Sequence, residues 1–247
     1  MAILELKEVT KTYNDFSVVK GFNFNVNEGE LRCLIGPNGA GKTTSLDLIT
    51  GRQKLTSGTV HFDGKNISKL LERDIAVLGV GRKFQVPAVF KELTVRENFE
   101  VSLTDKIGPF QNMNPFTKKR SRKHFNEIIE LAGLGNRLDT TAGFLSHGET
   151  QWLEIGMVLM QKPRLLLMDE PTAGMTEQET EKTSEIFKEL KGEHTLIVVE
   201  HDMSFVKSIA DVISVMHQGS MLAEGTLSEI EQHPKVKEVY LGTEGIN

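Results

Sequence analysis

GPNGAGKTT, residues 36–44, is the most informative stretch of this 247-residue chain. It follows the apolar run LRCLI (31–35), which is typical of a buried strand, and it leads into KTTSLDLIT, a helical pattern that ends at Gly51. A G-x-x-x-x-G-K-[ST] loop between a strand and a helix binds phosphate, because its glycines allow close approach and successive N–H groups face the anion. The residues expected to contact the nucleotide are Gly36, Pro37, Asn38, Gly39, Ala40, Gly41, Lys42, Thr43 and Thr44.

Two of these side chains have distinct expected roles. Lys42 carries a mobile positive charge for the β- and γ-phosphates, and the Thr43 hydroxyl is a Mg²⁺ ligand. A second motif, LLLMDEP (165–171), places Asp169 and Glu170 at the carboxyl end of a predicted buried strand, where open α/β sheets bind ligands. We expect Asp169 to hold Mg²⁺ and Glu170 to orient or deprotonate an attacking water. The two motifs together predict nucleotide hydrolysis.

The remaining pattern predicts one α/β domain over residues 1–247. The first third is rich in alternating strands, residues 94–162 read as a helical insert, and strand–helix alternation returns after them. Such alternation favours a mostly parallel sheet covered by helices. The net charge of −5 gives no reason to expect a nucleic acid partner, and the single Cys33 fits a reducing compartment. The apolar runs are strand-sized, so we expect no part of the chain to cross a membrane by itself.

The stretch LSHGE (145–149) allows two interpretations. Ser146 and Glu149 have the spacing of a capping box, in which each side chain accepts from the other residue's backbone N–H. The N-terminus of the same helix is also a ready site for an anion such as phosphate. Both interpretations can hold at once, and these residues alone do not decide between them.

The order of the motifs along nearly the whole chain resembles that of the ATPase subunit of ATP-binding cassette (ABC) transporters. Tyr13 in KTYNDF resembles the aromatic residue that stacks on adenine, and Gln85 in GRKFQVP resembles the glutamine that links Mg²⁺ to the membrane partner. LSHGE occupies the position of the family's signature, and His201 in VVEHD resembles the switch histidine. The resemblance implies a P-loop ATPase core with an N-terminal antiparallel β part, and it implies ATP and Mg²⁺ as cofactors. The catalytic residues that the resemblance implies are Lys42, Gln85, Glu170 and His201. The Mg²⁺ ligands that it implies are Thr43, Gln85 and Asp169.

The resemblance also implies partners. Two cassettes, identical or sister subunits, pack head to tail, so that Ser146 and the N–H of Gly148 contact the γ-phosphate bound by the other cassette. Two permease subunits and, indirectly, a periplasmic or lipid-anchored substrate-binding protein complete the complex. The permease is expected to dock on residues 86–93, after Gln85. The location implied is cytoplasmic, peripheral on the inner face of the cell membrane.

This sequence departs from the family pattern in two places. His147 and Glu149 stand where the commoner signature has Gly and Gln, and Met175-Thr176 replaces the usual Leu-Asp. His147 fits only if its backbone avoids positive φ. The ending HPKVKEVYLG resembles importers of branched-chain amino acids, amides and urea, and the His/Glu signature is most similar to the urea-type branch.

Three other functions are weighed against a transport motor. A cassette of translation or DNA repair would usually have two cassettes in one chain or a coiled-coil insert. A small GTPase would carry Asn-Lys-x-Asp for guanine recognition, and no such motif occurs. A pure nucleotide-binding switch would not need Glu170.

Overall fold

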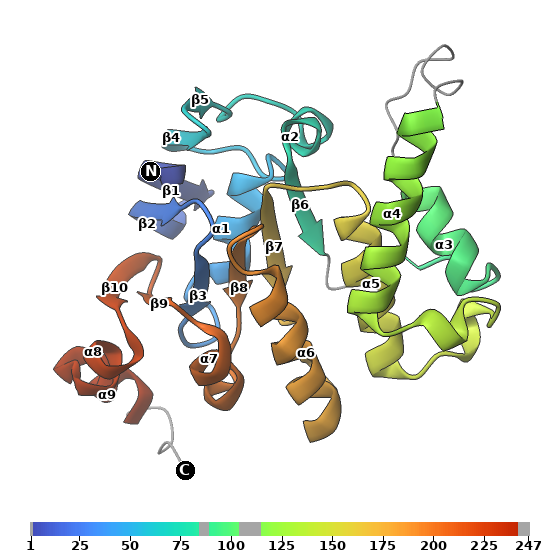
Figure 1. The fold of residues 1–247 in the computed structure, drawn as a ribbon. Coiled ribbons are helices and arrows are strands. Elements are labelled where there is room, and N and C mark those ends of the chain that lie inside the picture. Colours follow the sequence, from blue (N-terminus) through green and yellow to red (C-terminus); the bar gives the residue numbers. More distant parts are fainter. Residues whose placement is uncertain (1, 84–88, 104–114, 242–247) are drawn as a thin grey trace. The chain divides into compact units, whose positions relative to one another are not determined.

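The computed structural model describes residues 2–83, 89–103 and 115–241 (Figure 1). The chain forms two compact units. The sheet unit comprises Met1–Arg82, Arg164–Pro171 and Phe187–Asn247, and the helical unit comprises Lys83–Pro163 and Thr172–Ile186. Residues 94–162, expected from sequence as a helical insert, fall within the helical unit, which also contains residues 172–186 from beyond the strand that ends in Asp169.

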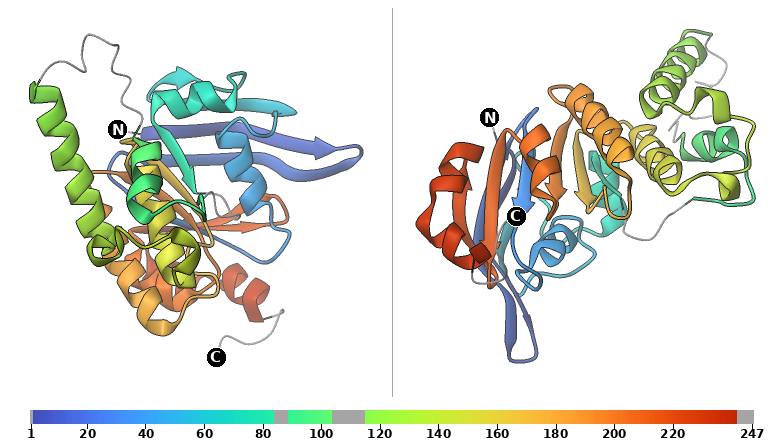
Figure 2. Two further views of the ribbon diagram at one scale, coloured as in Figure 1. Left: turned by 90° about the vertical axis from the view of Figure 1, so that its right-hand side faces the viewer. Right: turned by 90° about the horizontal axis from the view of Figure 1, so that it is seen from below.

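The first sheet of the sheet unit is antiparallel. It contains β1 (Ala2–Tyr13), β2 (Phe16–Asn27), β4 (Ser57–Phe62) and β5 (Lys65–Asn66) in the order β2-β1-β4-β5. The long β1–β2 hairpin is plain in Figure 2. Alternate residues of β2, Phe22, Phe24 and Val26, are buried, while the asparagines that follow each of them are exposed. This period-two pattern is what one buried face of an antiparallel sheet requires.

The second sheet runs in the order β10-β9-β3-β8-β7-β6. Its strands are β3 (Leu31–Ile35), β6 (Val80–Lys83), β7 (Leu165–Asp169), β8 (Thr195–Val199), β9 (Val212–His217) and β10 (Ser220–Gly225). β9, β3, β8 and β7 pair in parallel, whereas β10 pairs antiparallel with β9. Every residue of β3, β7 and β8 is buried, as expected for strands covered on both faces. The predicted α/β fold, with its antiparallel N-terminal part and mostly parallel sheet, is confirmed.

Several helices accompany the sheets in the described part of this unit. They are α1 (Lys42–Ile49), α2 (Glu72–Leu78), α7 (Met203–Ile209), α8 (Leu227–Gln232) and α9 (Pro234–Leu241). One hydrophobic core joins both sheets to α1, and its members include Phe22, Phe24, Leu46, Ile49, Phe62, Leu167 and Val199. Burying a side chain of this size stabilises the fold by roughly 1.5–3 kcal/mol. The core therefore fixes α1, and with it the end of the glycine-rich loop, against both sheets.

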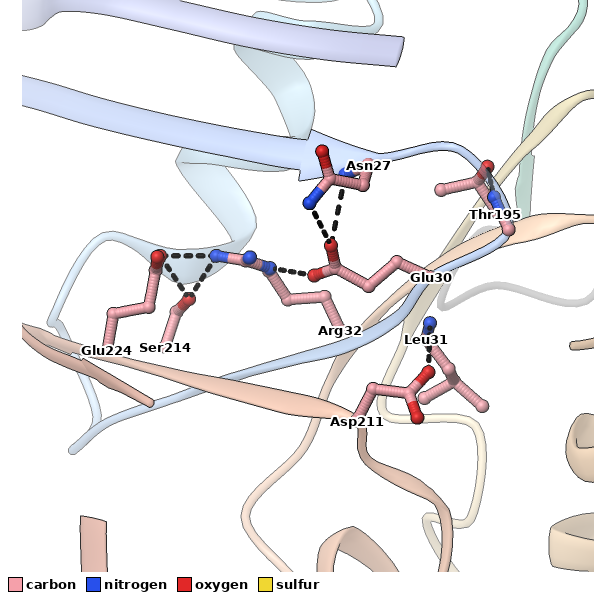
Figure 3. A network of polar contacts seen from close by, with 9 residues as sticks. Asn27, Glu30, Leu31, Arg32, Thr195, Asp211, Ser214 and Glu224 are labelled. Carbon is pink, nitrogen blue, oxygen red and sulfur yellow. Dashed lines mark hydrogen bonds and ion pairs between the residues drawn. The ribbon is translucent and has the colours of Figure 1, made fainter. Parts of the chain in front are cut away.

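A buried polar network fixes the start of β3 (Figure 3). Arg32, 4% exposed, donates to Glu30 at 2.6 Å and to Ser214 at 3.1 Å, and it also pairs with Glu224. The N–H of Leu31 donates to Asp211 at 3.0 Å. Paired carboxylates compensate the cost of burying a guanidinium, and here they tie β3 to β9 and β10. The strand that delivers the glycine-rich loop is therefore held at its beginning.

The helical unit contains α3 (Val95–Ser102), α4 (Pro115–Ala132), α5 (His147–Leu159) and residues 177–186 of α6 (Glu177–Leu190). Short 3₁₀ turns occur at Gly135–Arg137 and Ala142–Phe144. A Cβ on Gly156 would lie 2.5 Å from the Phe99 ring, so glycine allows α5 to approach α3 closely. The Trp152 indole donates to Thr183 at 3.0 Å, which joins α5 to α6.

Candidate nucleotide-binding site

The glycine-rich loop passes between two strands so closely that side chains are excluded at two positions. A Cβ on Gly36, whose φ is 152°, would lie 2.0 Å from the carbonyl oxygen of Met216 in β9. A Cβ on Gly41, at φ 100°, would lie 2.9 Å from the carbonyl oxygen of Val18 in β2. Only glycine combines such conformations with this proximity. The two glycines of the motif therefore bring the loop against β9 and β2.

The loop surrounds a cavity of about 180 Å³, lined by Val18, residues 38–44 and Glu170. Lys42 is 8% exposed, and its ammonium donates to the carbonyl oxygens of Gly36 at 2.7 Å and Pro37 at 3.1 Å. Burial lowers the pKa of Lys42, while the carboxylates of Glu170 and Asp169 act in the opposite direction. A positive charge thus lies beside a nest of backbone N–H groups, which suits a polyphosphate.

Thr43 and Asp169 meet beside this cavity. The Thr43 hydroxyl donates to Asp169 Oδ1 at 3.4 Å, and Thr43 is itself exposed. Burial raises the pKa of the Asp169 carboxyl, and Arg82 and the Thr43 hydroxyl counteract this shift. A hydroxyl and a carboxylate are hard oxygen ligands that fit Mg²⁺, which typically takes one or two protein groups and completes its shell with phosphate and water. Within the described ranges no group of three or more His, Cys, Asp or Glu side chains could hold a metal by itself.

Glu170 lies at the carboxyl end of β7 in an unusual backbone conformation. Its φ is 47°, and its N–H donates to the carbonyl of Val199 at 2.9 Å. A non-glycine residue at positive φ is strained, and such residues concentrate at functional sites. His201 follows β8 closely along the chain, and its Nδ1 lies 3.6 Å from Glu170 Oε1. The fold therefore brings together Lys42, Thr43, Asp169, Glu170 and His201, which are distributed over 160 residues of sequence.

Two further sequence candidates have different outcomes. Tyr13 ends β1 and is 41% exposed, with the Lys11 ammonium 4.6 Å from the centre of its ring. Its ring is thus accessible for stacking. Gln85 lies outside the described residues, as do residues 86–88 of the expected docking segment.

The LSHGE stretch opens α5 in the helical unit. Ser146 is the N-cap: its hydroxyl accepts from the N–H of Glu149 at 3.1 Å, and its own N–H donates to Glu149 Oε2 at 2.9 Å. The predicted capping box is confirmed. His147 is the first helical residue, and its φ is not positive. A histidine therefore fits at this position, where the commoner signature has glycine. Its Nε2 lies 2.9 Å from the carbonyl oxygen of Ala173.

Sequence reasoning missed Arg82. This side chain is 5% exposed, and it contacts Asp47 at 2.6 Å and Asp169 at 3.5 Å. It therefore holds a positive charge beside the carboxylate expected at the metal. The general signal is that an arginine needs an acidic partner when it is buried. Its partners lie 35 and 87 residues away, so spacing along the chain could not identify them.

Comparison with known proteins decides the family. The family model described as ABC transporter matches residues 19–173, and the model described as branched-chain amino acid ATP-binding cassette transporter matches residues 220–246. The chain belongs to the ABC transporter ATP-binding cassettes. This cassette is 37% identical to the high-affinity branched-chain amino acid transport ATP-binding protein BraF of Pseudomonas aeruginosa, over 97% of this chain and 98% of BraF. It is 34% identical to LivG of Escherichia coli K12, which has the same description, over 97% and 98% of the two chains.

Solved structures agree. A crystal structure of an ABC transporter cassette in its ADP conformation matches this cassette with a TM-score of 0.85 and 32% identity, covering 98% of this chain and 99% of that one. A nucleotide-free cassette matches with a TM-score of 0.80 and 32% identity, covering 97% and 98%. The protein is an ATPase of a transporter and belongs to the branched-chain amino acid branch of the family.

Proposed function

We propose that this ABC ATPase is the motor subunit of an importer of branched-chain amino acids. The observation that carries the proposal is the match of residues 220–246 to the branched-chain amino acid cassette model, beyond residues 19–173, which match the general ABC transporter model. The relatives BraF and LivG, similar over nearly their whole length, support the same cargo class.

The geometry supports an assignment of roles within the site. The backbone N–H groups of residues 38–44 and the Lys42 ammonium bind the β- and γ-phosphates of ATP, and the Tyr13 ring stacks on adenine. Thr43 and Asp169 would hold Mg²⁺, with Gln85 as a further ligand implied by the family resemblance, and the ion would supply positive charge beside the phosphates. Glu170 accepts a proton from the attacking water, and His201 contacts Glu170 and responds to the γ-phosphate.

The helical unit supplies the second half of each site in a head-to-tail dimer. Ser146 and the N–H of Gly148 open α5, where the helix dipole and the donors of the first turn favour an anion. Each hydrogen bond to a charged group contributes about 1.5–3 kcal/mol. Two donors at each of two sites give roughly 6–12 kcal/mol, comparable with the estimated 4–15 kcal/mol cost of association. ATP binding therefore closes the dimer, and hydrolysis opens it.

The ATPase subunit acts on a separate permease. No helix in the described part of the chain is long and apolar enough to cross a membrane. We assign docking of two permease subunits to the segment that begins after Gln85, where Phe90 is 49% exposed. An exposed aromatic side chain is a typical anchor of an interface. This docking places the cassette on the inner face of the cell membrane.

The cargo is tested by transport. Cells that carry Lys42→Ala in this chain should lose uptake of labelled leucine at low external concentration and keep uptake of labelled urea. The reason is that the variant disables the motor, whatever cargo its permease carries. The matched control is Lys69→Ala, at an exposed lysine outside the cavity, which should keep both activities.

Urea is the second candidate cargo, and the His147 and Glu149 signature is the observation that favours it. Loss of urea uptake with leucine uptake intact would reverse the cargo assignment. Such a result would leave the ATPase assignment unchanged, because the motor does not contact the cargo.

A further inference from the structure

Glu179, near the start of α6, joins two helix N-termini through one carboxylate. Its Oε2 accepts from the N–H of Thr176 at 2.9 Å and from the Thr176 hydroxyl at 3.0 Å, which closes a capping box on α6. Its Oε1 accepts from the Ser146 hydroxyl at 3.2 Å, and the carboxylate lies against Gly148, whose N–H helps to lower its pKa. One side chain therefore contacts the starts of both α6 and α5.

These contacts place an anion at the first turn of α5. Backbone and hydroxyl donors of Thr176, and then those of Ser146 and Gly148, hold the pKa of Glu179 below its usual range, so the group is ionised at neutral pH. A Cβ on Gly148 would lie 2.3 Å from Glu179 Oε1. Glycine at 148 is thus what lets the carboxylate approach the helix so closely.

The two donors at the start of α5 that face Glu179 are the same two that we propose bind the γ-phosphate of the partner's ATP. Ser146 and the N–H of Gly148 cannot give full hydrogen bonds to both a carboxylate and a γ-phosphate, and two anions at one helix N-terminus repel each other. The donors at the start of α5 are therefore already occupied by the Glu179 carboxylate of the same chain.

We propose that Glu179 is an internal competitor of the γ-phosphate, which holds the signature of the free cassette and must give up Ser146 and Gly148 before the dimer closes. The proposal rests on the head-to-tail dimer proposed above. It makes Glu179 a positioning residue for the reaction, which acts through Ser146 and Gly148 and sets the ATP concentration at which two cassettes associate.

Glu179→Gln separates this role from helix capping. A capping box accepts glutamine in place of glutamate, so α6 keeps its N-terminal cap. A glutamine amide has one acceptor end, and its NH₂ end can only donate. It cannot accept from Thr176 at one end and from Ser146 at the other, and it carries no charge. The variant should therefore release the α5 donors without unfolding α6.

The chain offers a matched control. Glu97 closes the corresponding capping box in α3, accepting from the Thr94 N–H at 2.7 Å and from the Thr94 hydroxyl at 2.8 Å. Glu97→Gln makes the same change of charge and of atoms at the same helical position, in the same unit, away from Ser146 and Gly148. Any effect of net charge or of helix capping should appear in both variants.

The experiment measures ATP-driven association by light scattering in a Glu170→Gln background, which blocks turnover. Adding Glu179→Gln should lower the ATP concentration for half-maximal dimer by roughly 30- to 150-fold, the difference between charged and neutral hydrogen bonds at two donors. Adding Glu97→Gln should leave it unchanged. With ADP, which lacks the γ-phosphate, Glu179→Gln should give no gain.

Each possible result supports or overturns the competitor role of Glu179. An unchanged or higher ATP requirement in the Glu179→Gln variant, or an equal gain in the Glu97→Gln control or with ADP, would overturn the competitor role and leave the dimer model in place. A Glu170→Gln background that never associates with ATP would instead overturn the dimer, and the competitor with it. Circular dichroism of each variant verifies that the helices are intact.

Discussion

Replacing Glu170 by glutamine is expected to lower ATP turnover by about 10²- to 10⁴-fold, the usual contribution of a positioned general base. Glu170 lines the phosphate cavity, is held at φ 47°, and lies 3.6 Å from His201. Glutamine preserves the size of the side chain and its neighbours but cannot take a proton from water. ATP affinity should stay nearly unchanged, because the loop, Lys42 and Thr43 are untouched.

Steady-state phosphate release and equilibrium binding of a fluorescent ATP analogue measure the two quantities separately. Glu193→Gln, at an exposed glutamate of the same unit, is the control and should behave as the wild type. Turnover in Glu170→Gln within a few-fold of the wild type would show that another group acts as the base.

Replacing Lys42 by alanine is expected to weaken ATP binding by roughly 10- to 100-fold, the loss of a hydrogen bond between charged groups. The Lys42 ammonium is the buried cation of the cavity wall, and it already donates to the carbonyl oxygens of Gly36 and Pro37. Without it, the loop retains its N–H groups but loses the point charge that balances the phosphates.

Titration calorimetry with ATP and with ADP measures the effect, and a thermal melt verifies that the variant is folded. Lys69→Ala should bind like the wild type. An ATP affinity for Lys42→Ala equal to that of the control would contradict the assignment of Lys42 to the phosphates.

The sequence predicts the features that follow from local pattern. The glycine-rich loop, the buried strand that ends in Asp169 and Glu170, and the capping box at Ser146 and Glu149 each depend on a few adjacent residues with fixed backbone requirements. Since carboxyl ends of parallel strands share one edge of a sheet, these patterns also place Glu170 near the loop.

Other features depend on contacts between distant segments. Two contacts illustrate this. Arg82 contacts Asp169, which is 87 positions away in the sequence, and Glu179 contacts Ser146, which is 33 positions away. No periodic pattern in the sequence indicates either contact. Glu170, at positive φ, likewise donates its N–H to Val199 in the neighbouring strand, 29 residues further along the chain. Only the folded chain brings these groups together.

Light scattering of the Glu170→Gln cassette, with and without ATP and Mg²⁺, tests the shared site most directly. The account predicts a 27.6 kDa monomer without nucleotide and a doubling of mass with ATP. A further Ser146→Arg substitution should abolish the doubling, because a bulky side chain replaces the hydroxyl at the start of α5. A dimer that forms without ATP and persists with Ser146→Arg would contradict the claim that each cassette completes the site of the other.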